Sequence, residues 1–122
     1  MEAQTIARSL ALGRVAIGAA LLALPRRAAA GWLGDVSRRP EAQVAIVGIG
    51  ARDVALGLGT AWASGGADGA KPWLLASAGG DVADLLVTLR HRDSLSRNAV
   101  IGVAALTGAS AALGLWLASE LD

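Results

Sequence analysis

The sequence predicts an all-α protein, a four-helix antiparallel transmembrane bundle, and three observations lead to this fold class. Hydrophobic residues make up 54% of the 122 residues and charged residues only 17%, whereas soluble domains carry about a quarter charged residues. Four apolar stretches approach the length of a membrane span, since about 20 helical residues cross a hydrocarbon core of roughly 30 Å. The range 98–119 contains no charged residue at all. The length suits a single transmembrane domain over 1–122.

The four predicted helices cover about 5–24, 41–63, 72–90 and 96–119. The first ends at Pro25-Arg26-Arg27, and its arginines lie inside and after the apolar run. We therefore expect a retained helix and not a cleaved signal peptide. Residues 28–40 are expected to form a polar connection and 64–69 a flexible turn. Ser94 and Ser96 are both candidate N-caps of the last helix.

The basic residues predict how the helices are oriented. Seven arginines fall in the connections after the first and third helices: Arg26, Arg27, Arg38, Arg39, Arg90, Arg92 and Arg97. The other side holds only Lys71 and Arg8. The positive-inside rule then places both odd-numbered connections in the cytoplasm and both termini outside, in a multi-pass plasma-membrane protein. The tryptophans agree, because Trp62, Trp73 and Trp116 would lie at the outer interface and Trp32 at the inner one.

Charged residues at mid-depth are the feature that a membrane helix should not have. Arg14 lies near the middle of the first helix, Arg52 and Asp53 in the second, and Asp81 and Asp84 in the third. Two central charges oppose insertion of the helix at 41–63 by ~5 to 7 kcal/mol, and its aliphatic residues return only ~2 to 4 kcal/mol. This helix therefore needs neighbours that pair its charges.

Helical spacing turns these charges inward. Steps of three and four residues place Ser77, Asp81, Asp84, Thr88 and His91 on one polar stripe. Arg52 and Asp53 can partly satisfy each other, but adjacent helical residues project about 100° apart, so each more naturally reaches another helix. We predict that Arg52 meets an aspartate of the third helix and that Asp53 meets Arg14.

Small residues predict where the helices pack closely. In the second helix these are Gly48, Gly57 and Gly59, and in the fourth Ala104, Gly108 and Ala112. Such small-residue spacing lets backbones approach each other in lipid. The row on the fourth helix could pack as the lid of the bundle or against a second copy.

The charge set allows a structural and a functional interpretation. In the first, it only fixes helix register and orientation. In the second, the two arginines against three aspartates leave one carboxylate in excess, which is a starting point for proton relay or cation binding. We hypothesise that Asp84, in line with His91, is the titrating member.

Other motifs carry less information. Residues 44–50 look briefly like a dinucleotide-binding strand and turn, but Asp53 stands at the third glycine position, where a carboxylate repels pyrophosphate. Residues 66–71 lack the spacing of a phosphate loop. With no cysteine and one histidine, a metal site would be all carboxylate beside two arginines. We expect no metal, cofactor or nucleic acid, and a non-enzyme more than an enzyme.

Residues 13–18 followed by Pro25, then 50–57 and 80–86, resemble the pattern of small four-helix integral membrane proteins in uncharacterised, DoxX-like families. The resemblance implies the four-helix membrane fold and makes Arg14, Arg52, Asp53, Asp81 and Asp84 the expected signature residues. These families bring no settled activity. Small multidrug exporters have a similar length and helix number, but they use a glutamate in the first helix where this chain has Arg14. That difference argues against drug–proton exchange.

Two functional classes follow. The favoured one is an accessory, scaffolding or partner-binding membrane protein, because one small bundle has little room for an alternating transport pathway. The alternative is a proton-linked transporter or small-ligand-binding membrane protein that uses its midplane aspartates. The expected partners are the lipid bilayer, a second copy or larger membrane complex, and a small polar ligand or proton. A lone monomer with a water-filled cavity at Asp81 would favour the second class. A dry, fully paired Arg–Asp core with an apolar groove on the fourth helix would favour the first.

Overall fold

The computed structural model describes residues 2–65 and 69–121, and all regular structure in these ranges is helical, which confirms the all-α class. The α-helices are α1 (Ala3–Ala23), α2 (Pro25–Leu33), α3 (Pro40–Ser64), α4 (Ala70–Arg90) and α5 (Arg97–Glu120). Two short 3-10 helices, η1 (Gly34–Arg38) and η2 (Arg92–Ser94), lie in the connections. The described ranges thus contain five α-helices, so the predicted count of four is not confirmed. Part of the turn predicted at 64–69 lies outside the described residues.

The additional helix, α2, corrects the polar connection predicted for 28–40. Pro25 ends α1, but it also occupies the first turn of α2. The backbone N–H groups of a first turn have no acceptor within the helix, so a proline without an N–H loses no hydrogen bond there. Gly34 then ends α2 with a φ of 66°, a positive value that glycine adopts without strain. Of the two candidate N-caps of α5, the structure selects Ser96, whose Oγ accepts a hydrogen bond from the Ala99 N–H at 3.1 Å.

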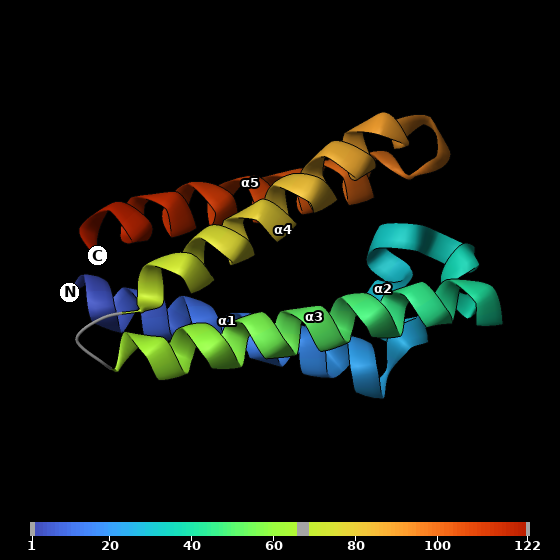
Figure 1. Ribbon diagram of the computed structural model, residues 1–122. Helices are drawn as coiled ribbons and strands as arrows, with labels where there is room; N and C mark the ends of the chain where they lie inside the picture. Colours follow the sequence, from blue (N-terminus) through green and yellow to red (C-terminus); the bar gives the residue numbers. More distant parts are fainter. Residues whose placement is uncertain (1, 66–68, 122) are drawn as a thin grey trace.

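The long helices form two antiparallel pairs that pack as two layers (Figure 1). One layer contains α1 and α3, and the other contains α4 and α5. Both termini lie at one end of the molecule, while α2, η1 and η2 lie at the other, called here the α2 end. The two layers lie closest near the termini and diverge toward the α2 end (Figure 1). The seven arginines of the two predicted cytoplasmic connections therefore all belong to segments at the α2 end.

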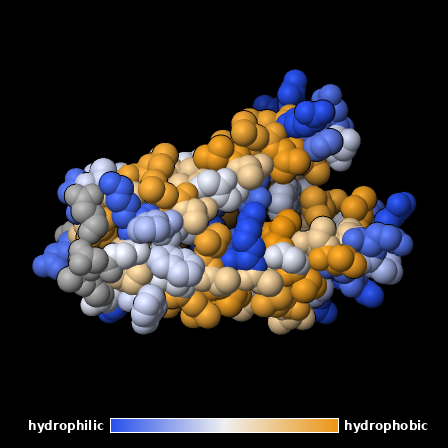
Figure 2. Space-filling view, viewed as in Figure 1, coloured by the Kyte–Doolittle hydropathy of each residue, from blue (hydrophilic) through white to orange (hydrophobic). Residues whose placement is uncertain are grey.

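Apolar residues are distributed inside out compared with a water-soluble bundle. Among the described residues, nine of the thirteen buried hydrophobic residues are alanines, and the large ones are only Leu21, Ile46, Leu74 and Leu117. In contrast, eighteen large hydrophobic residues are exposed, including Leu58, Leu86 and Leu106 at 55%, 60% and 56%. Figure 2 shows apolar surface over the body of the molecule and hydrophilic surface mainly at its two ends.

Three helices, α1, α3 and α5, are long and apolar enough to cross a membrane. The predicted third span corresponds to α4, which is as long as α1 but is not among these three. The reason is its polar content, because Asp81 and Asp84 lie in its second half. Its inward residues include the buried Ser77, Asp81 and Thr88.

Glycines make the closest contact between α1 and α3. A Cβ on Gly18 would lie 2.7 Å from the Gly50 carbonyl oxygen, and one on Gly57 would lie 2.7 Å from the Ala11 carbonyl oxygen. Gly59 likewise lies against the ring of Trp73 on α4. Of the predicted packing residues, Gly57 and Gly59 are therefore at helix contacts.

The remaining predicted packing positions are not at helix contacts of this kind. Added Cβ atoms at Gly48 and Gly108 would meet no other atom within 4 Å in the described chain. Ala112 is exposed, and Ala104 and Gly108 are half-buried. Gly48 is directed outward because Ile46 and Gly50 form the buried row of this part of α3. In this part of α3 the glycine at the contact with α1 is Gly50, which was not among the predicted packing residues.

Candidate functional site

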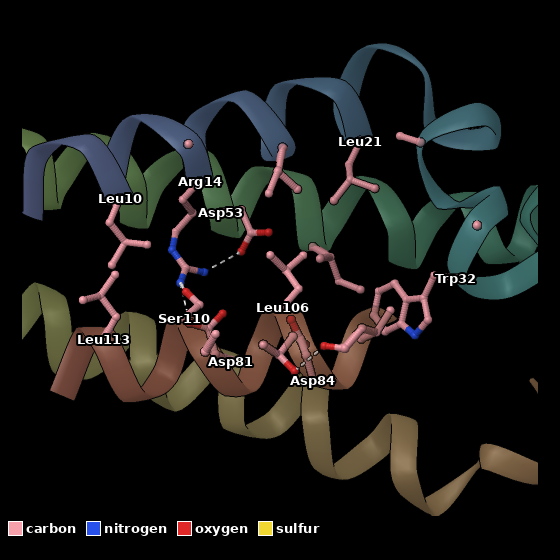
Figure 3. A pocket seen from close by; sticks show the side chains of 18 of the residues that line it. Leu10, Arg14, Leu21, Trp32, Asp53, Asp81, Asp84, Leu106, Ser110 and Leu113 are labelled. Atoms are coloured by element: carbon pink, nitrogen blue, oxygen red, sulfur yellow. Dashed lines mark hydrogen bonds and ion pairs between the residues drawn. The ribbon is translucent and has the colours of Figure 1, made fainter. Parts of the chain in front are cut away.

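Arg14 is the centre of the buried charge cluster. Its Nη2 donates to Asp81 Oδ2 on α4 at 2.5 Å and to Ser110 Oγ on α5 at 3.2 Å. Its Nη1 lies 3.5 Å from Asp53 Oδ1 on α3. The Arg14 side chain is only 10% exposed. One guanidinium on α1 therefore contacts the other three long helices, as Figure 3 shows.

Arg52 forms a second centre in the same cluster. Its Nη1 and Nη2 donate to the two carboxylate oxygens of Asp84 at 3.2 and 2.7 Å, in a two-point ion pair. Its Nε and Nη2 also reach Asp53 Oδ1, at 3.3 and 3.1 Å. The Arg52 guanidinium lies beside Gly80, where a Cβ would be 3.6 Å from its central carbon. Both predicted pairings, Arg52 with the third long helix and Asp53 with Arg14, are therefore present.

The hydrogen bonding leaves two carboxylate oxygens unused. All bonds to Asp53 reach Oδ1, and the bond to Asp81 reaches Oδ2. Within the described chain, no hydrogen bond reaches Asp53 Oδ2 or Asp81 Oδ1. In Asp84, by contrast, both oxygens are held by Arg52. The two unused oxygens therefore belong to Asp53, which contacts both arginines, and to Asp81, which contacts Arg14.

This geometry changes the hypothesis for Asp84. The sequence alone singled out Asp84 because it lies in line with His91. In the structure His91 follows the last residue of α4 and is exposed, whereas the polar stripe before it faces inward. The two-point pairing of Asp84 with Arg52 makes Asp53 and Asp81 better candidates for binding a cation.

A cavity of about 620 Å³ opens beside the cluster. Its charged lining residues are Arg14, Asp53, Asp81 and Asp84, and most of the remaining lining is apolar. The apolar walls come from α1, α3 and α5, with these residues: Leu10, Ile17, Leu21, Ile49, Val103, Leu106 and Leu113. From α2, Ala28, Gly31 and Trp32 close one end. Figure 3 shows Arg14, Asp53, Asp81 and Ser110 gathered together, with Trp32 well away from them along the cavity.

Trp32 links α2 to the polar stripe of α4. Its Nε1–H donates to Thr88 Oγ1 at 3.1 Å, and Thr88 is buried. Trp32 is half-buried and lines the cavity. Its predicted position at the inner membrane interface stays a prediction. Further along the stripe, Ser77 Oγ is buried with no hydrogen-bond partner among the described residues.

Sequence reasoning missed Ser110, Thr107 and the cavity role of Trp32. Thr107 and Ser110 are the hydroxyl residues of the otherwise apolar range 99–118, and their spacing of three positions places them on one face. That spacing could have indicated that the two hydroxyl groups face the charge cluster. The position of Trp32 depends on α2, and its cavity role could not be derived while α2 was taken for a connection.

Comparisons with family models, curated proteins and solved structures find no match to the chain. The resemblance to DoxX-like families therefore stays a prediction from the quoted motifs. Any function must be argued from the cavity and the charge cluster.

Proposed function

We propose that this protein is an integral membrane protein that binds a small ligand in the cavity between α1 and α5. The membrane assignment rests on the inside-out arrangement of apolar residues. Large aliphatic side chains face outward on every long helix, and alanine and glycine fill the contacts between helices. This is the pattern expected where lipid, and not water, surrounds the bundle.

In the proposed orientation α1, α3, α4 and α5 cross the plasma membrane as an antiparallel bundle, and α2 lies at the cytoplasmic surface. The seven arginines of the α2 end support this orientation through the positive-inside rule. Both termini then lie outside. Although α4 is the least apolar span, its two aspartates are paired with Arg14 and Arg52 and do not enter lipid as free charges.

The cavity is the observation that carries the ligand-binding proposal. A volume of about 620 Å³ lies in the range of small-molecule sites. Apolar walls with a few convergent polar groups are typical of such sites. Here the polar groups are charged, buried and fixed by a network that spans four helices. A network needed only for helix register requires no adjoining cavity.

A matched pair of substitutions tests whether the cavity binds ligands. Gly13 lines the cavity and Gly48 does not, and a Cβ at either position meets no described atom within 4 Å. Gly13→Leu should fill the cavity, whereas Gly48→Leu should add surface outside it. Thermal unfolding in mild detergent would be measured with a panel of small amphipathic compounds, because ligands that bind the folded state stabilise it. We expect stabilisation of the wild type and Gly48→Leu but not of Gly13→Leu. Equal responses of the two variants would refute the proposal.

The second candidate is the scaffolding or partner-binding role. One observation favours it: the Arg52 side chain is 32% exposed although it belongs to the buried cluster. Figure 2 shows hydrophilic surface in a hollow at mid-length, surrounded by apolar residues. A second copy or another membrane protein would cover such a charge. Single-molecule subunit counting in lipid tests the form of this role that uses a second copy, because a monomer that binds ligands excludes an obligate homo-oligomer.

A further inference from the structure

We infer, on the basis of the proposed function, that the ligand is a lipophilic amine with one positive charge. The inference starts from the charge balance of the cluster. The cluster contains two guanidinium groups and three carboxylates, so it has a net charge of −1 when all are ionised: Arg14, Arg52, Asp53, Asp81 and Asp84. Of these residues only Arg52 does not line the cavity. The cavity wall therefore carries one cation and three anions.

Hydrogen-bonding capacity points in the same direction as charge. The unused Oδ2 of Asp53 and Oδ1 of Asp81 can only accept hydrogen bonds while these carboxylates are ionised. An ammonium group has several N–H donors and no acceptor, so it complements two such oxygens. A ligand carboxylate would instead face two carboxylates that already hold the Nη groups of Arg14. Like charges in a low-dielectric site repel strongly.

The apolar part of the cavity sets the shape of the rest of the ligand. From Arg14 to Leu21 the lining follows α1 for seven residues, which at ~1.5 Å per residue gives about 10 Å. Ile17, Leu21 and Leu106 line this part, and Trp32 closes it. An aliphatic or aromatic body of about this length therefore fits beside an ammonium group held at Asp53 and Asp81.

The rim of the cavity indicates the route of entry. Ile17 on α1 and Leu106 on α5 both line the cavity, and they are 45% and 56% exposed. In the proposed orientation these side chains face hydrocarbon, so the cavity opens sideways into the membrane. A lipophilic amine dissolved in the bilayer could enter between α1 and α5 without crossing the polar ends of the bundle.

Three probes with the same chain test the ligand class: decylamine, decanol and decanoate at pH 7. Equilibrium dialysis against the protein in phosphatidylcholine nanodiscs measures saturable binding, and empty nanodiscs correct for partitioning. We expect decylamine to bind at least tenfold more tightly than decanol or decanoate. Asp81→Asn should reduce decylamine affinity at least tenfold and decanol affinity by a clearly smaller factor, because decanol carries no charge. If that variant fails to fold, the comparison of the three probes on the wild type decides alone.

The Gly13→Leu and Gly48→Leu variants separate failure of this inference from failure of the proposed function. If Gly13→Leu abolishes selective binding of decylamine and Gly48→Leu retains it, the result supports both the ligand-binding function and the amine assignment. Equal binding of the three probes, lost only in Gly13→Leu, overturns the amine assignment and leaves the ligand site in place. If no probe binds saturably, or if the two variants bind the probes equally, the ligand-binding function and the amine assignment are both overturned.

Discussion

Arg52 and Asp84 form a two-point ion pair between α3 and α4, with Nη1 3.2 Å from Oδ1 and Nη2 2.7 Å from Oδ2. The planar guanidinium fork matches a carboxylate in this geometry, which a lysine could not reproduce. The pair joins the two layers near mid-length, where few apolar side chains are buried between them. Because Arg52 also contacts Asp53, its side chain links Asp53 to Asp84.

The coupling between Arg52 and Asp84 can be measured with a double-mutant cycle. We expect the Arg52→Gln and Asp84→Asn substitutions to show a coupling of about 1 to 2 kcal/mol, less than a fully buried pair because Arg52 is partly exposed. The measurement is thermal or denaturant unfolding in detergent micelles. Asp84→Asn combined with Arg90→Gln, on the same helix but outside the cluster, should show additive effects. A full charge swap is less clean, because Arg52→Asp would place a carboxylate beside Asp53.

Removal of the Arg14 charge should have the largest effect on stability of any charge in the molecule. Arg14→Gln leaves Asp53 and Asp81 without their shared cation, and breaking a buried pair costs about 3 to 5 kcal/mol. Arg14→Lys should recover little, because one ammonium cannot reproduce contacts with three helices. Unfolding measurements would compare these variants with Arg8→Gln, an exposed arginine of the same helix. Equal losses for Arg14→Gln and Arg8→Gln would contradict the central role of Arg14.

Much of the fold could be predicted because it depends on local patterns. Apolar runs, the arginine distribution and polar residues at steps of three and four are visible in the sequence, and four of the five α-helices overlap the predicted ranges. The error at α2 came from treating Pro25 only as a helix stop. A proline can also begin a helix, and α2 is rich in alanine, which favours helix.

The charge cluster was partly predictable, but the cavity was not. Spacing placed Arg14, Arg52 and the three aspartates at one depth, and charge pairing then limited the partners. The choice of Asp84 over Asp81 for Arg52 depends on how α3 and α4 pack, which the sequence does not specify. The cavity depends on the divergence of the two layers, a tertiary property with no periodic signal.

Gly18 should tolerate no side chain at the crossing of α1 and α3. A Cβ there would lie 2.7 Å from the Gly50 carbonyl oxygen and 2.8 Å from the Val54 nitrogen, and neither backbone atom can rotate away. We expect Gly18→Ala to destabilise the protein by about 1 to 3 kcal/mol, as overpacking does. Gly102→Ala, on an open helix surface, should be neutral or stabilise by up to about 1 kcal/mol through helix propensity. Thermal unfolding of the two variants in detergent provides the comparison.

The Trp32–Thr88 hydrogen bond should hold α2 against α4 at the end of the cavity that Trp32 closes. Trp32→Phe removes the Nε1–H donor but keeps an aromatic ring, and Thr88→Val removes the acceptor with little change in shape. Each loss should cost about 0.5 to 1.5 kcal/mol. Local opening of α2 must break this bond, the hydrogen bond from Ser37 Oγ to the Arg26 carbonyl and a few apolar contacts. Loss of the Trp32–Thr88 bond should therefore accelerate amide hydrogen exchange over 25–33 by about two- to tenfold.

Hydrogen–deuterium exchange with mass spectrometry would read this change peptide by peptide. Exchange in the middle of α3 should stay unchanged, since the effect is local, and Trp116→Phe on the exposed face of α5 serves as the control. Trp32→Phe and Thr88→Val should be non-additive when combined, because both remove the same bond. Unchanged exchange over α2 in both variants would show that apolar packing of Ala29 and Leu33 holds this helix, and that the hydrogen bond contributes nothing to closing the cavity.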